Sequence, residues 1–159
     1  MKLRIRQRVF SWTDSYDVYD ETGEARYEVR AKLFSLGHQI LVYDKRTGEQ
    51  VGSIHEKLLS FLPRFEIVVN GNSLGNVSKE FRFFRPRYHV DYMDWSVDGD
   101  LMGWDYQVYQ DNREIMTIEK ELFRWSDTYV LTYSDPKNEL PGLLLVLAID
   151  AANCSDHND

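Results

Sequence analysis

The sequence has few of the features that cross-link or anchor a chain. Its single cysteine, Cys154, cannot form an internal disulfide. The longest strongly apolar segment, residues 140–152, contains Pro141, Gly142 and Asp150, and it is shorter than the roughly 20 residues that cross a bilayer as a helix. The first residues also lack the apolar stretch of a secretory signal. We therefore expect a cytoplasmic protein without disulfides and without a transmembrane segment.

The sequence also has fewer basic than acidic residues. The chain has 19 lysines and arginines against 26 aspartates and glutamates, which gives a formal net charge of −7. Such a charge repels the phosphate backbone of nucleic acids, so we expect no nucleic-acid partner. Linkers and low-complexity tracts are absent as well, and 159 residues is a usual length for one domain. The sequence therefore predicts a single domain spanning residues 1–159.

Recognisable catalytic motifs are missing. The sequence contains no glycine-rich phosphate loop, no Gly-x-Ser-x-Gly turn and no Cys–His signature. The histidines are scattered, and no two have the spacing of a metal-ligand pair: His38, His55, His89 and His157. We therefore expect no catalytic residue, no metal and no cofactor. An enzyme whose residues come together only in the fold is left open.

One segment formally matches a calcium-binding loop. Residues 94–105 place oxygen-bearing side chains at positions 1, 3, 5 and 12 of an EF-hand pattern, with Gly99 at position 6. Position 12 is Asp105, whose side chain is shorter than the usual glutamate. The flanking segments also have the character of strands rather than helices. We interpret this segment as an acidic turn between strands, with calcium binding as the alternative.

Aromatic residues, by contrast, are abundant. Four tryptophans, ten tyrosines and eight phenylalanines favour strands over helices. Six short segments are rich in aromatic or β-branched residues, and residues suited to tight turns follow most of them. Because a second strand is expected after each turn, the pattern predicts six hairpins. The six segments are 16–19, 40–43, 65–69, 88–92, 106–109 and 129–133.

The expected second strands share an unusual spacing. Apolar residues lie three and then four positions apart in residues 51–58, 74–81 and 115–122. This spacing is also that of an amphipathic helix. Turn residues on both sides favour strands, and we expect these strands to bend or bulge near the charged pair that each contains. The charged pairs are Glu56-Lys57, Lys79-Glu80 and Lys120-Glu121.

About twelve strands in one domain are expected to close on themselves, because closure removes their exposed edges. The interior of such a barrel must be filled. Residues 141–153 are apolar on nearly all sides, as a helix buried in a core should be, and Pro141 suits a first helical turn. We therefore predict a mainly β protein: an antiparallel closed barrel of about twelve strands that encloses a hydrophobic C-terminal helix at about 141–153. A final strand in place of this helix is the alternative.

Three segments resemble the LURP-one-related proteins of the tubby-like superfamily. They are Tyr-Asp-x-x-Thr-Gly at 43–48, Trp-Asp-Tyr-x-Val-Tyr at 104–109 and the apolar segment 140–152. The resemblance implies a twelve-stranded barrel around a central helix. Its wider relatives include tubby proteins, which bind phosphoinositides, and phospholipid scramblases. This chain lacks the cysteine-rich cluster and proline-rich tail of a scramblase, and the lipid-binding residues of tubby proteins have no identifiable counterparts in it.

Two groups of basic residues are candidates for binding an anion. At the N-terminus, cations alternate with Leu3, Ile5 and Val9, so they share one face of a strand. In the second group, arginines flank Phe83 and Phe84, and arginine suits phosphate because its planar fork donates two hydrogen bonds. If the groups converge, they form a headgroup site; the alternative is two ordinary surface faces. The candidate residues are Lys2, Arg4, Arg6, Arg8, Arg82, Arg85 and Arg87.

These observations predict a non-catalytic, tubby-like binding domain. We expect its ligand to be an anionic phospholipid headgroup or a protein partner at the membrane surface, so the cytoplasmic protein would be peripheral to the membrane. The alternative is a barrel that binds or transforms a small molecule of unknown identity.

Overall fold

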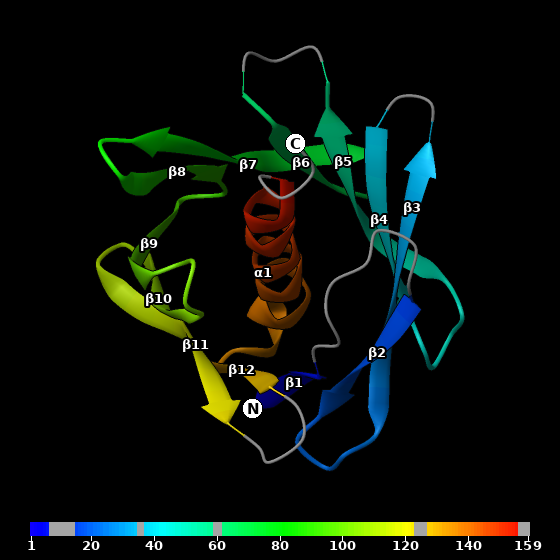
Figure 1. Cartoon of the computed structure of the whole chain (residues 1–159). Coiled ribbons are helices and arrows are strands. Elements are labelled where there is room, and N and C mark those ends of the chain that lie inside the picture. Colours follow the sequence, from blue (N-terminus) through cyan, green and yellow to red (C-terminus); the bar gives the residue numbers. More distant parts are fainter. Residues whose placement is uncertain (7–14, 35–36, 59–61, 123–126, 156–159) are drawn as a thin grey trace.

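The computed structural model describes residues 1–6, 15–34, 37–58, 62–122 and 127–155. They form twelve strands followed by a short 3-10 helix and one α-helix (Figure 1). The strands are β1 (Lys2–Arg6), β2 (Ser15–Asp20), β3 (Ala25–Phe34), β4 (Gly37–Asp44), β5 (Gln50–Lys57), β6 (Arg64–Val69), β7 (Asn72–Arg82), β8 (Arg85–Tyr92), β9 (Trp95–Asp100), β10 (Asp105–Gln110), β11 (Arg113–Leu122) and β12 (Asp127–Tyr133). The helices are η1 (Pro136–Asn138) and α1 (Glu139–Cys154).

All twelve strands belong to one antiparallel sheet, with the order β8-β7-β6-β5-β4-β3-β2-β1-β12-β11-β10-β9. Strand β1 pairs with β2 on one side and with β12 on the other, so it joins the first and the last of the remaining strands. The sheet curls into a barrel around α1 (Figure 1). Strands β8 and β9 are its two edges, so the barrel is nearly closed and has a seam between them. The predicted barrel is therefore confirmed, apart from this one unpaired junction.

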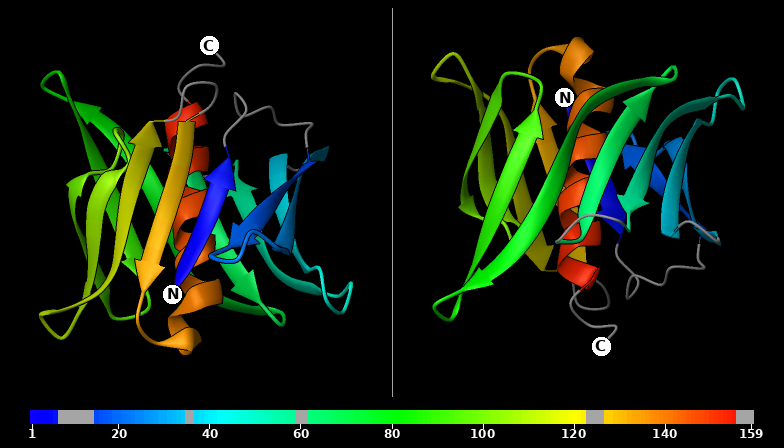
Figure 2. Two further views of the ribbon diagram at one scale, coloured as in Figure 1. Left: turned by 90° about the horizontal axis from the view of Figure 1, so that it is seen from below. Right: turned by 90° about the horizontal axis from the view of Figure 1, so that it is seen from above.

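Helix α1 fills the barrel. Every residue from Gly142 to Ala152 is buried, and Figure 2 shows the helix running along the barrel axis. This confirms the core helix and excludes the alternative of a final strand. The helix begins at Glu139, two residues earlier than predicted, and Pro141 lies in its first turn, where a missing N–H costs little.

Tyrosine hydroxyls from the strands hold both ends of this helix. Near its start, Tyr92 of β8 donates to the carbonyl oxygen of Pro141 at 2.9 Å. Near its finish, Tyr88 of the same strand donates to the Asn153 side chain at 2.5 Å. Strand β8 therefore runs antiparallel to α1. Because successive strands alternate in direction, the β7–β8 and β9–β10 turns lie at the end of the barrel where α1 finishes, which we call the C-end.

The three-then-four apolar spacing has its origin in bulges beside the turns. Val42 pairs with Gly52 but Tyr43 pairs with Gln50, so Val51 is an extra residue in β5. Corresponding register shifts make Leu74 and Ile115 extra residues in β7 and β11. All three bulged residues pack against the core. A bulge places the next inward residue three positions along instead of two.

The expectation of bulges near the charged pairs is therefore wrong. The register is regular at all three pairs, since Lys57 faces Arg64, Lys79 faces Tyr88 and Lys120 faces Tyr129. The extra residue lies at the opposite end of each strand. A bulge increases local twist, and next to a tight turn it helps each hairpin coil around α1.

Candidate functional site

Cations gather on the outer face of strands β5–β8, toward the C-end. Lys57 lies directly opposite Arg64, and at the next hairpin Arg82 lies opposite Arg85. Like charges placed directly opposite each other destabilise a sheet. The outward pairing of Lys57 with Arg64 concentrates positive charge on this face, although the whole chain has a net charge of −7. We call the exposed residues Lys57, Arg64, Arg85 and Arg87 the basic face.

Acidic neighbours neutralise this face only in part. Lys57 forms an ion pair with Glu66 at 3.3 Å between Nζ and Oε1. Glu80 lies opposite Arg87 and accepts a 3.2 Å contact from the His89 ring. Within the described part of the chain, no ion pair involves Arg64, Arg85 or Arg87. Three guanidinium groups therefore remain available to an incoming anion.

The basic face ends at an aromatic hairpin tip. The two-residue turn between β7 and β8 consists of Phe83 and Phe84, whose exposed fractions are 93% and 98%. Both have positive φ angles, 48° and 68°. Turns of this kind favour asparagine and glycine, because a side chain on such a backbone is strained. The sequence marked these phenylalanines only as neighbours of the arginines, and their full exposure comes from the fold.

The structure separates the two basic groups predicted from the sequence. Strand β1 lies in the middle of the sheet between β2 and β12, whereas β8 is an edge strand, so the two groups do not converge. The position of a residue in the sequence does not show where it lies around a barrel. Because the two groups lie apart, the hypothesis that they form one shared site is wrong. Arg8 lies outside the described residues, and so does the side chain of Arg82.

The cations of β1 form no ion pair with any residue that the structure describes. Lys2, Arg4 and Arg6 point outward, while Leu3 and Ile5 are buried beneath them. Through the pairing with β12, Arg4 is in line with Glu119 of β11, about 10 Å away at two strand spacings. The Arg6 guanidinium lies 5.3 Å from the centre of the Tyr19 ring. A ligand-binding role for this group stays a prediction.

Lys57 and Arg64 were not among the residues proposed from the sequence. They lie on different strands of the β5–β6 hairpin, seven positions apart, so no local motif connects them. The signal that could have found them is the register of the β5–β6 hairpin, which depends on the length of its loop.

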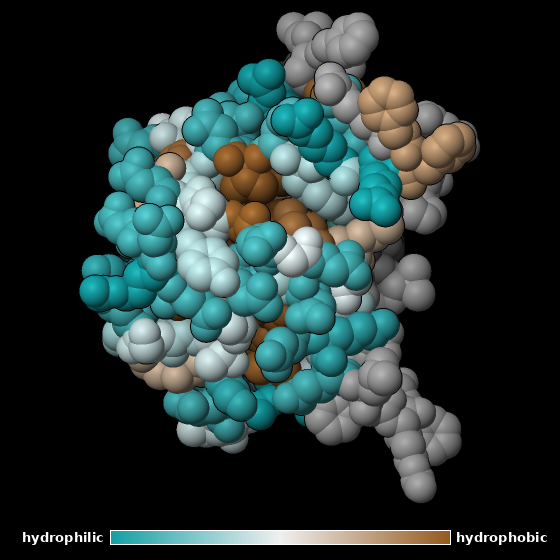
Figure 3. Space-filling model, turned by 90° about the vertical axis from the view of Figure 1, so that its left-hand side faces the viewer, coloured by the Kyte–Doolittle hydropathy of each residue, from teal (hydrophilic) through white to brown (hydrophobic). Residues whose placement is uncertain are grey.

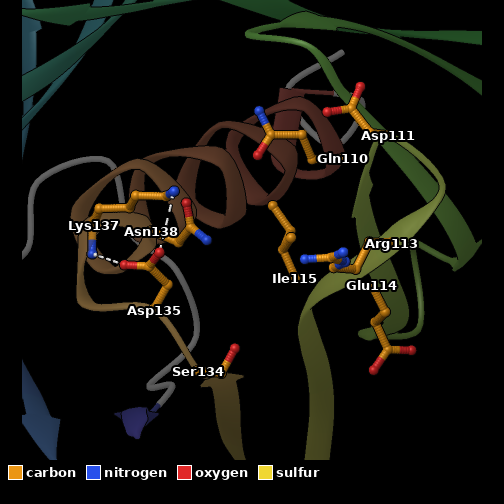
Figure 4. A pocket seen from close by; sticks show the side chains of 9 residues that line it. All are labelled: Gln110, Asp111, Arg113, Glu114, Ile115, Ser134, Asp135, Lys137 and Asn138. Carbon is orange, nitrogen blue, oxygen red and sulfur yellow. Dashed lines mark hydrogen bonds and ion pairs between the residues drawn. The ribbon is translucent and has the colours of Figure 1, made fainter.

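A hollow of about 330 Å³ lies between the β10–β11 turn and the segment that leads into α1 (Figure 4). Cations and carboxylates are mixed in its lining, and Lys137 pairs with Asp135 at 3.2 Å. No single charge dominates it, so it does not select an anion. Its lining residues are Gln110, Asp111, Arg113, Glu114, Ile115, Ser134, Asp135, Lys137 and Asn138.

A second hollow, of about 620 Å³, lies outside β4–β6 and includes His55 and Glu66 in its lining. The His55 ring is 2.8 Å from the hydroxyl of Ser53, which resembles a nucleophile with its base. Burial lowers the pKa of His55, which favours the neutral form of the ring. Ser53, however, is only 5% exposed. Its hydroxyl is covered by its neighbours, and the contact is therefore part of the packing.

The calcium-like segment is not a loop. Residues Trp95–Asp100 form strand β9 and pair with β10, and Asp100 accepts a 2.9 Å hydrogen bond from the Gly103 backbone in the following turn. The expected acidic turn is thus a whole strand plus a short turn. Across the described ranges, no group of three or more histidines, cysteines, aspartates and glutamates could hold a metal ion.

Comparison with known proteins places this barrel in a family. The LURP-one-related family model matches residues 1–150. The chain belongs to the LURP-one-related family. Among its relatives, this LURP-one-related chain is 28% identical to "Uncharacterized protein YxjI" of Bacillus subtilis (strain 168) over 159 residues, which covers all of this chain and 98% of the relative.

A solved structure shares the fold of this LURP-one-related chain. The X-ray structure of a protein from Arabidopsis thaliana matches it with a TM-score of 0.60 and 15% sequence identity. The match covers 94% of this chain and 91% of the plant protein. Among the residues with described positions, no helix combines the length and apolar character needed to cross a bilayer. The functional proposal therefore rests on the charged and apolar side chains at the surface.

Proposed function

We propose that this LURP-one-related chain is a non-catalytic binding domain whose basic face docks on anionic phospholipid headgroups at a membrane surface. One observation carries the proposal: four exposed cations from β5, β6 and β8 share one outward face near the C-end, although the whole chain is acidic. Arg64, Arg85 and Arg87 offer planar forks that suit phosphate oxygens.

The magnitude of the electrostatic attraction is modest. Each lysine or arginine close to an anionic membrane contributes about 1 kcal/mol, so the three arginines of the basic face supply about 3 kcal/mol. This attraction decays within a Debye length of about 8 Å at physiological salt. The proposed binding is therefore reversible and sensitive to ionic strength.

The acidic remainder of the protein supports one orientation. A chain with a net charge of −7 is repelled by an anionic surface on most of its faces. The side that carries the basic face is attracted to that surface. This asymmetry distinguishes the proposed docking from non-specific adsorption.

Sedimentation with vesicles tests the proposal. We expect binding to phosphatidylcholine vesicles that contain phosphatidylserine, weaker binding at high salt, and little binding to pure phosphatidylcholine. The double variant Arg64→Gln, Arg87→Gln should bind about 30-fold more weakly, because it loses about 2 kcal/mol of attraction.

The matched control removes the same charge from β1, with Lys2→Gln and Arg4→Gln. It should keep most of the wild-type affinity. Equal losses in the two double variants would contradict the assignment to the basic face. Wild-type protein that ignores phosphatidylserine at low salt would overturn the proposed function itself.

A further inference from the structure

The β7–β8 tip exposes apolar surface that the fold does not use. Phe83 and Phe84 are almost completely exposed. Leu58 at the end of β5 and Met102 in the β9–β10 turn are 56% and 45% exposed, and both lie at the same C-end. The C-end therefore concentrates large exposed apolar side chains, and in Figure 3 apolar side chains protrude from an otherwise mostly hydrophilic face.

The backbone conformation of the tip is unfavourable for the two phenylalanines that occupy it. Two other two-residue turns of this barrel carry the residues that their geometry favours, Asn70-Gly71 and Asp111-Asn112, whereas the β8–β9 turn places Met93 at a φ of 50°. Only the β7–β8 turn, among the turns described, places two aromatic residues at positive φ. Strain of this kind persists where function requires it, and here its result is to hold two phenyl rings outward.

The charges around the tip indicate what covers it. Arg85 and Arg87 are exposed on β8, directly after the phenylalanines. Two copies of this tip would repel each other, whereas anionic lipid headgroups complement it. Arginine and proline on edge strand β8 also discourage pairing with another sheet. That protection accounts for Arg85, Pro86 and Arg87, but not for exposed phenylalanines.

We infer that Phe83 and Phe84 form a wedge that enters an anionic bilayer at the boundary between headgroups and acyl chains, while Arg85 and Arg87 bind the headgroup phosphates. This inference rests on the proposed function and adds the element that inserts. The barrel then stands on the membrane with its C-end, which is the end of the barrel at which α1 finishes in Figure 2. Burial of one phenylalanine side chain corresponds to at least about a tenfold gain in affinity.

A variant that improves the turn while removing the wedge gives the sharpest test. Phe83→Asn with Phe84→Gly installs the pair that this turn favours, so the protein should melt at the same or a higher temperature. Its affinity for phosphatidylserine-containing vesicles should nevertheless fall at least about 100-fold, because two phenyl rings are lost. The control Met93→Ser removes an apolar side chain that is 44% exposed at the opposite end of the barrel, and should bind as the wild type does.

Insertion itself is measured with an environment-sensitive fluorophore. In a Cys154→Ser background, the label is attached at Phe84→Cys, or at Thr22→Cys in an exposed turn of the opposite end. Addition of phosphatidylserine-containing vesicles should shift the emission of the Phe84→Cys label to shorter wavelength. The emission of the Thr22→Cys label should stay unchanged.

The possible outcomes separate the two proposals. If the wild type does not bind these vesicles, the proposed function fails. If the wild type binds and the Asn-Gly variant binds equally well, the wedge is overturned and the proposed function stands. If lipid-free wild-type protein self-associates through the tip and the Asn-Gly variant does not, the tip is a contact between proteins and the wedge is again overturned.

Discussion

Asp150 lies on α1, where the barrel interior surrounds it, and is only 4% exposed. Burial raises the pKa of its carboxyl group to about 7. Tyr16 of β2, Tyr106 of β10 and Cys154 face it, and burial together with the charge of Asp150 raises the pKa of each. These groups are neutral near pH 7. Lys79 of β7 is also buried and lowers the pKa of Cys154, but the pKa of Asp150 is raised by burial alone.

Because Asp150 is buried, we expect its ionisation to lower the stability of the folded protein in a pH-dependent way. In the unfolded chain the Asp150 carboxyl loses its proton near pH 4, whereas in the folded chain it does so near pH 7. The folded state therefore holds the extra proton in this interval, and stability falls as the pH rises from about 4 to about 7. The loss amounts to about 4 kcal/mol and is constant above that range.

Asp150→Asn should consequently be more stable than the wild type above pH 7 and similar to it near pH 4. Urea unfolding of both proteins across this range measures the difference. Comparison at each pH cancels the opposite trend from carboxylates such as Asp44, whose pKa is lowered by the backbone N–H of Arg46 and the side chain of Arg26 despite partial burial. Asp98→Asn, at an exposed position of β9, is the control. A constant gap between wild type and Asp150→Asn at all pH values would contradict the assignment.

At the scale of elements, the β7–β8 pairing depends on Gly75, which follows the bulged Leu74. A side chain at Gly75 would place its Cβ 2.1 Å from the carbonyl oxygen of Asp91 in β8, and its φ is +142°. The backbone of β8 cannot yield as a flexible side chain can. Gly75 therefore sets how closely the strand that carries Arg85 and Arg87 approaches β7.

We expect Gly75→Ala to destabilise the protein by about 3 kcal/mol or more, because it adds a backbone clash to the strain of positive φ. The matched control is Gly71→Ala, since Gly71 also has positive φ but has nothing within 4 Å of the added Cβ. That variant should lose only about 1 kcal/mol. Chemical denaturation distinguishes the two, and equal losses would show that the close approach to β8 is unimportant.

The elements were predictable wherever one local signal sufficed. Aromatic segments followed by turn residues located six strands, and the unbroken apolar segment located α1. Strand β9 was missed because its acidic residues match a calcium-loop pattern and only its pairing with β10 makes it a strand. The bulges were assigned to the wrong ends of their strands, because apolar spacing reveals an extra residue only when the facing strand is known.

Across the whole molecule, the fold could be predicted from the sequence more completely than the candidate site. Arg85 and Arg87 were identified from their chain neighbours, but Lys57 and Arg64 join them only through the register of three strands. The same strand order separates the β1 cations from this face. Composition could predict neither the gathering of cations on this face nor its separation from the β1 cations. Strand order and register determine which charges share a surface.

We propose a barrel that is built around a buried helix and that meets anionic membranes with its C-end. Amide hydrogen exchange with and without phosphatidylserine-containing vesicles tests this most directly. We expect the amides of residues 142–152 to exchange slowest in both conditions, and vesicles to slow exchange selectively at residues 83–87. Rapid exchange in α1, or vesicle protection at the opposite turns 21–24 and 111–112 instead of the β7–β8 tip, would contradict the claim.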